Sequence, residues 1–203
     1  MTTLPLRRFV VLGQKATTDA TFSLDDVPGT TGRLDVLLRA LPAALLVSHG
    51  LRRDTVVYLV LYNNGEGAPR TVRIDGRTAS YLRPDERAMA GRIRAMLGTD
   101  AEGCAFGSER QGMAIADGGL DSVLADLTGE ETLYVLDEAG DDVRGRSIDR
   151  VHPVFFVGDH LGFDPGVRAR LDAEGAKAVR VGPISLHADQ AIVLMQSELD
   201  RGA

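Results

Sequence analysis

Thr55-Val56-Val57-Tyr58-Leu59-Val60-Leu61-Tyr62 is the stretch that decides the fold. It consists of β-branched, leucine and aromatic residues, without the polar alternation of a half-exposed strand. An uninterrupted apolar run of this length is typical of a central strand that is buried on both faces of a sheet. Helices must then cover both faces, and this stretch therefore favours an α/β domain.

The rest of the chain alternates between strand and helix patterns, which predicts a mostly parallel sheet. Further strands are expected at Arg8–Leu12, Thr71–Ile74, Thr132–Leu136, Val154–Val157 and Ala178–Val181. Helices are expected after Thr31 as a cap, with Pro42 ending or kinking that helix, then from Pro84-Asp85-Glu86, after Asp117 as a cap, over Val167–Leu171 and over His187–Leu199.

Three loops that follow apolar strands in the second half are the expected ligand site. They are Asp137–Asp142, Gly158–Gly162 and Gly182–His187. In a parallel sheet, ligands bind at the carboxyl ends of the strands, where such loops meet. The Gly182-Pro183 turn precedes a helix, and this arrangement leaves backbone N–H groups free for a ligand. The same segment would also serve as an ordinary strand-to-helix turn.

Composition excludes several classes of protein. The 203 residues are 44% hydrophobic and 26% charged, as in a folded globular domain, and no segment resembles a membrane span. We expect a single cytoplasmic domain over residues 1–203. Neither the dinucleotide fingerprint, the phosphate-binding loop nor the serine-hydrolase elbow occurs. The pairs Asp159-His160 and His187/Asp189 lack a clear third ligand, so no metal site is predicted.

Charge is distributed unevenly along the chain. Residues 1–100 hold 14 Lys and Arg against 10 Asp and Glu, whereas residues 101–203 hold 9 against 19. Nearly all the basic residues are arginine, whose planar guanidinium binds phosphate through two hydrogen bonds. A net-basic half is compatible with a nucleic-acid partner, although a genome rich in arginine codons would give the same composition.

Two segments of the second half resemble one known family. V-F-F-V-G-D-H-L-G (Val154–Gly162) and V-G-P-I-S-L-H-A-D (Val181–Asp189) are similar to the cofactor region of TrmY-type methyltransferases, in the SPOUT class of knotted RNA methyltransferases. Motifs of the first half match the same family in order: Asp26-Val27-Pro28-Gly29, Gly32-Arg33-Leu34-Asp35, Ser48-His49, Arg52-Arg53-Asp54 and Pro84-Asp85-Glu86-Arg87. The resemblance covers nearly the whole chain.

The resemblance implies the fold, the reaction and the partners. It implies a SPOUT-type, mostly parallel sheet with helices on both faces and a trefoil knot in the cofactor-binding half, residues 101–203. It implies S-adenosylmethionine as cofactor, N1-methylation of a pseudouridine in the T-loop of tRNA, and a homodimer. The net-basic half, residues 1–100, is then the expected RNA-facing half. The residues implied in cofactor binding are Leu136, Gly158, Val181, Gly182, Pro183, Ile184, Ser185 and Leu186.

The acid–base and RNA-binding residues are hypotheses. Asp35 is the candidate base or base-orienting group, and Asp54 is the second candidate. A first-turn acid at position 35 would equally suit the helix dipole. Arg33, Arg52 and Arg53 are the candidate phosphate ligands.

One pair of residues departs from the family pattern. Archaeal members are expected to have His and Cys after H-A-D, whereas this chain has Gln190 and Ala191. A small alanine can pack where a cysteine packs, so cofactor binding is expected to persist. The family also includes bacterial homologues whose RNA target the resemblance does not fix, and this chain is a candidate member of that branch. Two alternatives stay open: an RNA-binding homologue without turnover, and a methyltransferase acting on another RNA or a small molecule.

Overall fold

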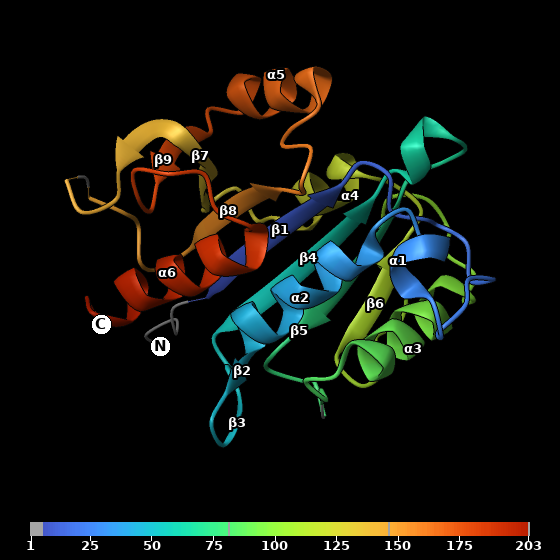
Figure 1. Ribbon diagram of the computed structural model, residues 1–203. Helices are drawn as coiled ribbons and strands as arrows, with labels where there is room; N and C mark the ends of the chain where they lie inside the picture. The colour runs from blue at the N-terminus through green and yellow to red at the C-terminus, as the bar shows by residue number, and fades with distance from the viewer. Residues whose placement is uncertain (1–5, 81, 146, 203) are drawn as a thin grey trace.

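The computed structural model describes residues 6–80, 82–145 and 147–202. One seven-stranded sheet runs through it, in the order β6-β5-β4-β1-β8-β7-β9 (Figure 1). Its strands are β1 (Arg7–Gly13), β4 (Thr55–Leu61), β5 (Arg70–Asp75), β6 (Met113–Ala116), β7 (Thr132–Asp142), β8 (Pro153–Gly158) and β9 (Lys177–Arg180). A separate hairpin is formed by β2 (Leu46–Val47) and β3 (Gly50–Leu51), and a 3₁₀ turn, η1, covers Asn63–Gly65.

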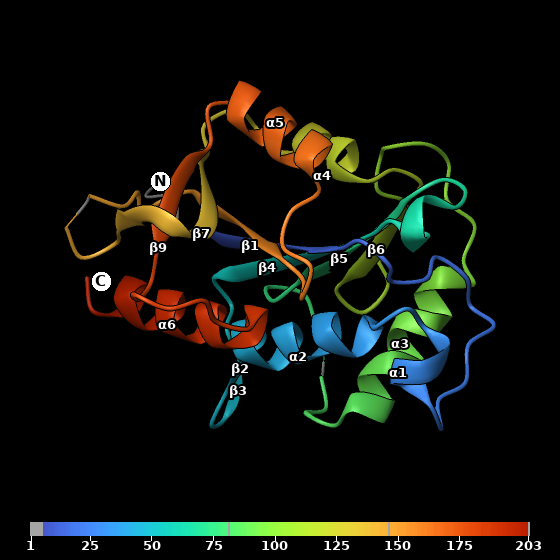
Figure 2. The same cartoon turned by 45° about the horizontal axis from the view of Figure 1, so that its top comes forward.

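Helices cover both faces of this sheet. They are α1 (Val27–Thr30), α2 (Leu34–Leu45), α3 (Glu86–Leu97), α4 (Leu120–Asp126), α5 (Pro165–Ala173) and α6 (Ala188–Asp200). Figure 2 shows α1, α2, α3 and α6 on one face and α4 and α5 on the other. Among the described residues, no helix is long and apolar enough to cross a lipid bilayer.

The sheet is mostly parallel, as the alternating pattern predicts. β1 pairs in parallel with β4 and β8, and β7 pairs in parallel with β8 and β9. Only β5 and β6 run antiparallel to their neighbours. The stretch Thr55–Leu61 forms β4, and all seven of its residues are buried. The α/β class with helices on both faces is confirmed; the knot stays a prediction.

Alternation along β1 explains how one sheet supports two cores. Phe9 and Val11 pack with α2, α3 and α6, whereas Val10 and Leu12 pack with α4 and α5. Phe155 of β8 extends the first core sideways: its ring stacks on Phe9 at 5.4 Å between centroids and on Tyr134 at 5.2 Å. Each stacked pair contributes about 0.5–1.5 kcal/mol beyond its buried area.

Several local expectations differ from the structure. Of the two outcomes expected at Pro42, an end of the helix is wrong: α2 continues to Leu45, because its buried face includes residues on both sides of the proline. Thr31 is not the N-cap of α2, which is Arg33, although the Thr31 hydroxyl accepts a hydrogen bond from the Leu34 N–H at 3.1 Å. Asp117 does not cap α4; its N-cap is Gly119, and the Asp117 carboxylate instead accepts a hydrogen bond from Arg70 Nε at 2.8 Å. The segment Asp137–Asp142 is not a loop but the second half of β7.

Candidate functional site

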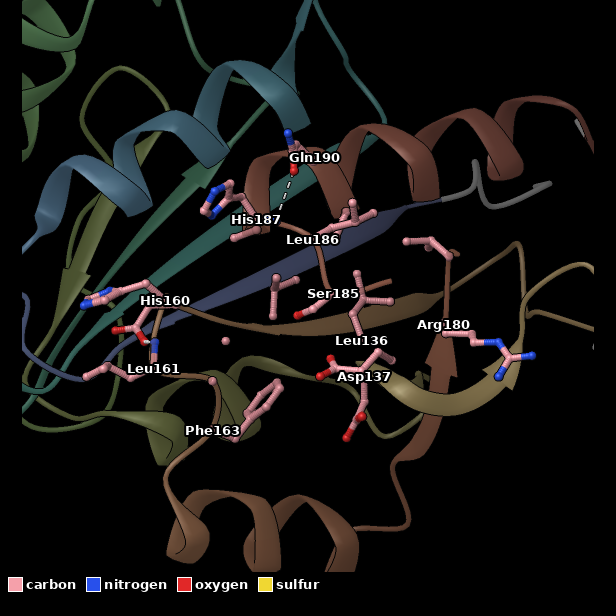
Figure 3. A pocket seen from close by; sticks show the side chains of 18 of the residues that line it. Leu136, Asp137, His160, Leu161, Phe163, Arg180, Ser185, Leu186, His187 and Gln190 are labelled. Carbon is pink, nitrogen blue, oxygen red and sulfur yellow. Dashed lines mark hydrogen bonds between the residues drawn. The ribbon is translucent and has the colours of Figure 1, made fainter. Parts of the chain in front are cut away.

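A large cavity lies where the carboxyl ends of β7, β8 and β9 meet. It has a volume of about 1020 Å³, and all three segments expected from the sequence contribute to its wall. Figure 3 shows Leu136, Ser185 and Leu186 on one side of it and His160 and Leu161 on the opposite side. Helix α2 also reaches the cavity through Val36. The position agrees with the rule that ligands of parallel sheets bind at strand ends.

A bulge in β7 shapes the first wall. Strand β7 pairs with β9 up to Leu136 and again from Asp141, with a register shift between them. Gly140 lies in this bulge against β9, where a Cβ would come within 2.5 Å of the carbonyl carbon of Ala178. The close approach of the two backbones requires glycine. The bulge places Asp137 and Glu138 at the cavity.

The loop after β8 forms the second wall and is tied to the end of β1. The Asp159 carboxylate accepts hydrogen bonds from the backbone N–H of Gln14 at 2.8 Å and of Leu161 at 2.8 Å. The Gln14 side chain donates to the carbonyl oxygen of Gly162 at 3.0 Å. Gly158 faces this carbonyl directly, since a Cβ at 158 would lie 2.7 Å from it. The wall is therefore held in place by backbone contacts.

The segment between β9 and α6 forms the third wall. The backbone N–H groups of Gly182, Ile184, Ser185 and Leu186 donate no hydrogen bond within the part of the chain that the structure describes. Helix α6 begins beside them with a capping box in which Gln190 Oε1 accepts from the His187 N–H at 3.2 Å. Free N–H groups at a helix start suit ligand carboxylates and ring nitrogens.

Two opposite charges on the cavity wall are paired. Arg168 of α5 donates through Nη1 to Asp137 Oδ2 at 2.5 Å. The hydrogen bond from the Ala139 N–H lowers the pKa of Asp137. Burial raises this pKa, and the hydrogen bond from Arg168 lowers it again, so that it lies below its ordinary value. The hydrogen bonds to Asp137 and Asp172 raise the pKa of Arg168. Both groups are therefore charged at neutral pH.

These walls fit S-adenosylmethionine, the cofactor expected from the resemblance. Apolar side chains including Val157, Val179 and Leu186 offer a surface for a flat adenine ring. The free N–H groups of the third wall can meet hydrogen-bond acceptors on that ring. The Asp137 carboxylate can face a positive charge, and the Arg168 guanidinium can face a carboxylate. A cavity of about 1020 Å³ is large enough for such a ligand.

The expected cofactor residues come together in this cavity. Leu136, Gly158, Val181, Gly182, Ile184, Ser185 and Leu186 line it. Pro183 is the single member of the expected set that does not. The departure at Gln190 and Ala191 is accommodated, because Gln190 completes the cap of α6 and Ala191 is buried at its first turn.

Asp35 and Arg33 form a pair at the start of α2. Arg33 donates to Asp35 through Nε at 2.9 Å and Nη2 at 3.2 Å, and the Asp35 carboxylate is 4% exposed. Arg39 lies 3.5 Å from the same carboxylate. Asp35 does not line the cavity, but its neighbour Val36 does. Arg33 has φ of 72°, a left-handed conformation that is uncommon for a residue with a side chain.

Arg52 and Arg53 lie at the other end of α2, after the β2–β3 hairpin, and have partners within the chain. Arg52 holds the carboxylate of Asp200 at 3.0 and 2.6 Å. Arg53 donates to the carbonyl oxygens of Gly76 and Ala79 at 2.7 and 2.9 Å. Asp54, the second candidate base, lies 3.3 Å from Arg7 and far from the cavity wall. The structure does not bring these residues to the site.

Sequence reasoning missed Val36, Phe163, Arg168 and Arg180 on the cavity wall. Arg168 lies on α5, whose N-cap is Asp164 and whose first residue is Pro165. An Asp-Pro pair is a common start of a helix, so this signal could have located the beginning of α5. The partner of Arg168, Asp137, is 31 positions earlier, a separation that no local pattern reveals. Among the described residues, no group of three or more His, Cys, Asp or Glu side chains could hold a metal ion.

Comparison with known proteins gives one family across residues 6–203, described as "Putative SAM-dependent RNA methyltransferase". The chain is 40% identical over 197 residues to the tRNA (pseudouridine(54)-N(1))-methyltransferase of Methanosarcina acetivorans, covering 97% of this chain and 92% of that protein. It is 41% identical to the enzyme of the same name from Halobacterium salinarum, covering 96% of each. Both relatives are archaeal and give no support to a bacterial branch.

A solved structure shares the fold. Archaeoglobus fulgidus Nep1 bound to S-adenosylhomocysteine matches with a TM-score of 0.62, covering 97% of each chain, at 13% identity. At this identity the likeness concerns the architecture of the sheet and its helices.

Proposed function

This chain belongs to the family of SAM-dependent RNA methyltransferases, and from that membership we propose that it transfers a methyl group to N1 of pseudouridine 54 in tRNA. The observation that carries the proposal is the convergence of the three strand-end segments on one cavity with free backbone donors. The names of the archaeal relatives supply the nucleotide. A cytoplasmic location, where tRNA is modified, forms part of the proposal.

The division of labour follows from the chemistry of the reaction. Bound S-adenosylmethionine supplies an activated methyl group on a sulfonium, so the chain has mainly to position the nucleotide and accept its N1 proton. N1 of pseudouridine is an imide-like N–H and a poor nucleophile while it keeps that proton. The backbone donors of residues 182–186 orient the cofactor, with Pro183 shaping their turn.

Asp35 acts by orienting Arg33. Its buried carboxylate is occupied by two hydrogen bonds from that guanidinium, so it has little freedom to take a proton. The left-handed backbone at Arg33 supports a functional role, because strained residues persist where the site needs them. The Arg33 side chain is 45% exposed beside the cavity-lining first turn of α2, where its guanidinium is accessible to an RNA phosphate.

Arg52 and Arg53 remain part of the RNA-binding proposal in a lesser role. Arg53 stays exposed although its Nη1 is bonded, and Arg52 is 20% exposed beside it. Both follow the β2–β3 hairpin, which projects from the sheet in Figure 1. Their position at the far end of α2 suits a phosphate distant from the reacting base.

The proposal includes a homodimer formed through the face of α2 and α6 beside the cavity. A shallow groove of about 500 Å³ lies there, lined by Arg39, Pro42, Ala43, Leu186, Asp189, Gln190, Val193 and Leu194. Its apolar side chains are exposed, Val193 at 51% and Leu194 at 40%. Arg39 and Asp189 carry opposite charges on this groove, so a twofold arrangement can pair one with the other across two copies, which supports a second copy as the occupant.

Methyl transfer to defined RNAs tests the function. Purified protein is incubated with S-adenosylmethionine carrying a labelled methyl group and with tRNA that has either pseudouridine or uridine at position 54. We expect label only in the pseudouridine RNA, at N1 by mass spectrometry of nucleosides. Label in both RNAs would contradict the proposed position, and cofactor binding without any transfer would favour a homologue that binds RNA without turnover.

Light scattering tests the dimer. We expect a mass of two chains for the native protein and one chain for Val193→Glu, since burying that charge in the groove is costly. A Glu substitution at exposed Val47, which lies in the hairpin, is the control and should leave the mass unchanged. A monomeric native protein would contradict the dimer.

A further inference from the structure

We propose that Arg168 and Asp137 form a clamp for the amino-acid end of the cofactor, with the guanidinium binding its carboxylate and the Asp137 carboxylate binding its ammonium. The inference rests on the proposed use of S-adenosylmethionine and assigns two residues that carry opposite charges. An α-amino acid presents one anion and one cation a few ångströms apart. A matched pair of opposite charges on a cavity wall is the simplest receptor for that arrangement.

The pair is distinct among the charged groups of the cavity. Asp137 and Arg168 both line it, come from different elements, and are the one oppositely charged pair of this kind within residues 6–80, 82–145 and 147–202. Asp159 is taken up by two backbone N–H groups. Arg180 lies 3.8 Å from Asp142, which is outside the lining. Within the part of the chain that the structure describes, Glu138 forms no salt bridge with a basic residue of the wall.

Each member of the clamp is held by a second partner that does not touch the other. Asp172, one turn along α5, accepts from Arg168 Nε at 3.0 Å. The Ala139 N–H donates to Asp137 Oδ1 at 2.9 Å. These outer bonds persist when the inner bond between Arg168 and Asp137 is exchanged for a ligand. Each charged side chain is thus kept in one orientation on its own element, which reduces the entropy lost on binding.

The helix that carries Arg168 can accommodate a ligand between the two charges. Leu171 is the buried residue of α5; the rest of the helix is partly or fully exposed. In Figure 2, α5 stands above the end of the sheet and is joined to β8 by an extended segment. A small outward movement of α5 therefore disturbs few apolar contacts.

Ligand truncation separates recognition of the amino-acid end from general shaping of the cavity. S-adenosylhomocysteine carries the amino-acid end, whereas 5′-methylthioadenosine keeps the adenosine and the sulfur but lacks that end. Dissociation constants for both ligands are measured by titration calorimetry with the native full-length protein and with Arg168→Gln, Arg168→Lys and Asp137→Asn. Arg170→Gln is the matched control, because Arg170 lies on the same helix, is 53% exposed and pairs with Glu174 away from the cavity.

We expect Arg168→Gln to weaken the binding of S-adenosylhomocysteine by about ten- to a hundredfold and to leave the affinity for 5′-methylthioadenosine unchanged. Asp137→Asn should act in the same direction, Arg168→Lys should retain part of the affinity, and Arg170→Gln should change neither ligand. If Arg168→Gln does not fold by circular dichroism, the lysine and asparagine variants carry the test.

Two results would overturn the clamp while leaving the proposed function intact. One is an equal loss of affinity for the two ligands in the Arg168 and Asp137 variants, which would show that these residues only shape the cavity wall. The other is native affinity for S-adenosylhomocysteine in both Arg168→Gln and Asp137→Asn. If the native protein binds neither ligand, the assignment of the cavity to this cofactor is itself wrong, and the clamp fails with it.

Discussion

Replacing Gly158 with alanine is the sharpest test of the second cavity wall. The added Cβ would lie 2.7 Å from both the carbonyl carbon and the oxygen of Gly162, whereas ordinary contacts begin at 3.4 Å. The obstacle is backbone, so a side-chain rotation cannot relieve it. The loop must retreat by about 0.7 Å, the difference between those two distances.

The cost follows from what that retreat disturbs. The Gly162 carbonyl also accepts from the Gln14 side chain, so this hydrogen bond stretches together with the loop. Overpacking of this kind destabilises by about 1–3 kcal/mol. For a domain of this length, that range lowers the melting temperature by about 2–12 °C. The displaced loop should also weaken the binding of S-adenosylhomocysteine by about tenfold or more, because a shift of the wall by this distance breaks hydrogen bonds to a ligand.

Thermal unfolding and calorimetry measure these two effects on the same preparation. Gly107→Ala is the control, because a Cβ there finds its nearest atom at 3.7 Å and the position lies near β6, at the opposite edge of the sheet. It should leave both stability and cofactor affinity near native. If Gly158→Ala kept native stability and native affinity, the argument from the close approach of these two backbones would be refuted.

Three further predictions concern α2, α6 and the RNA. Thr31→Val should lower the free energy of unfolding, measured by urea denaturation, by about 1–2 kcal/mol, because the buried hydroxyl accepts a hydrogen bond from the Leu34 N–H at 3.1 Å. An unchanged urea midpoint would count against the contribution of this hydrogen bond. Burial alone would raise the pKa of Asp200, but hydrogen bonds from Arg52 and Arg7 hold this pKa below the ordinary value of 3.8. The ionised carboxylate therefore stabilises the fold above pH 3.8, and this stabilisation is lost as the pH falls through the lowered pKa. Asp200→Asn should therefore flatten the acid loss of stability measured between pH 5 and pH 2, and a curve as steep as native would contradict the pairing. Arg33→Gln should weaken the binding of tRNA and reduce the slope of log affinity against log salt concentration by about 1, with S-adenosylhomocysteine binding unchanged. If the variant lost cofactor binding instead, the assignment of Arg33 to RNA binding would be wrong.

Much of the site was accessible from the sequence because it is built from strand ends. Apolar runs such as Thr132–Leu136 and Val154–Val157 identify parallel strands, and the carboxyl ends of such strands meet at one edge. The convergence of three segments on one cavity follows from that geometry without any knowledge of side-chain contacts.

Other features depend on tertiary contacts and were out of reach. Pro42 disfavours helix locally, but the packing of Leu41 and Leu45 on the sheet keeps α2 intact past it. Strand β6 was missed because two of its four residues are alanine, which does not favour strands. Arg52 looked free for RNA because its partner Asp200 lies 148 positions away.

The central position of β1 has a consequence for synthesis of the chain. β1 leaves the ribosome before the other strands of the sheet, and β4 can pair with one of its edges early. Its other edge pairs only after β8 is made, because Arg8 pairs with Val154, 146 positions later. At about 5–20 residues per second, that edge of Val and Phe residues stays open for about 7–30 s on every nascent chain. Unpaired apolar edges of this kind recruit other strands. The edge therefore stays open longest when translation is slow, and a chaperone that covers β1 until β8 arrives would protect the nascent chain.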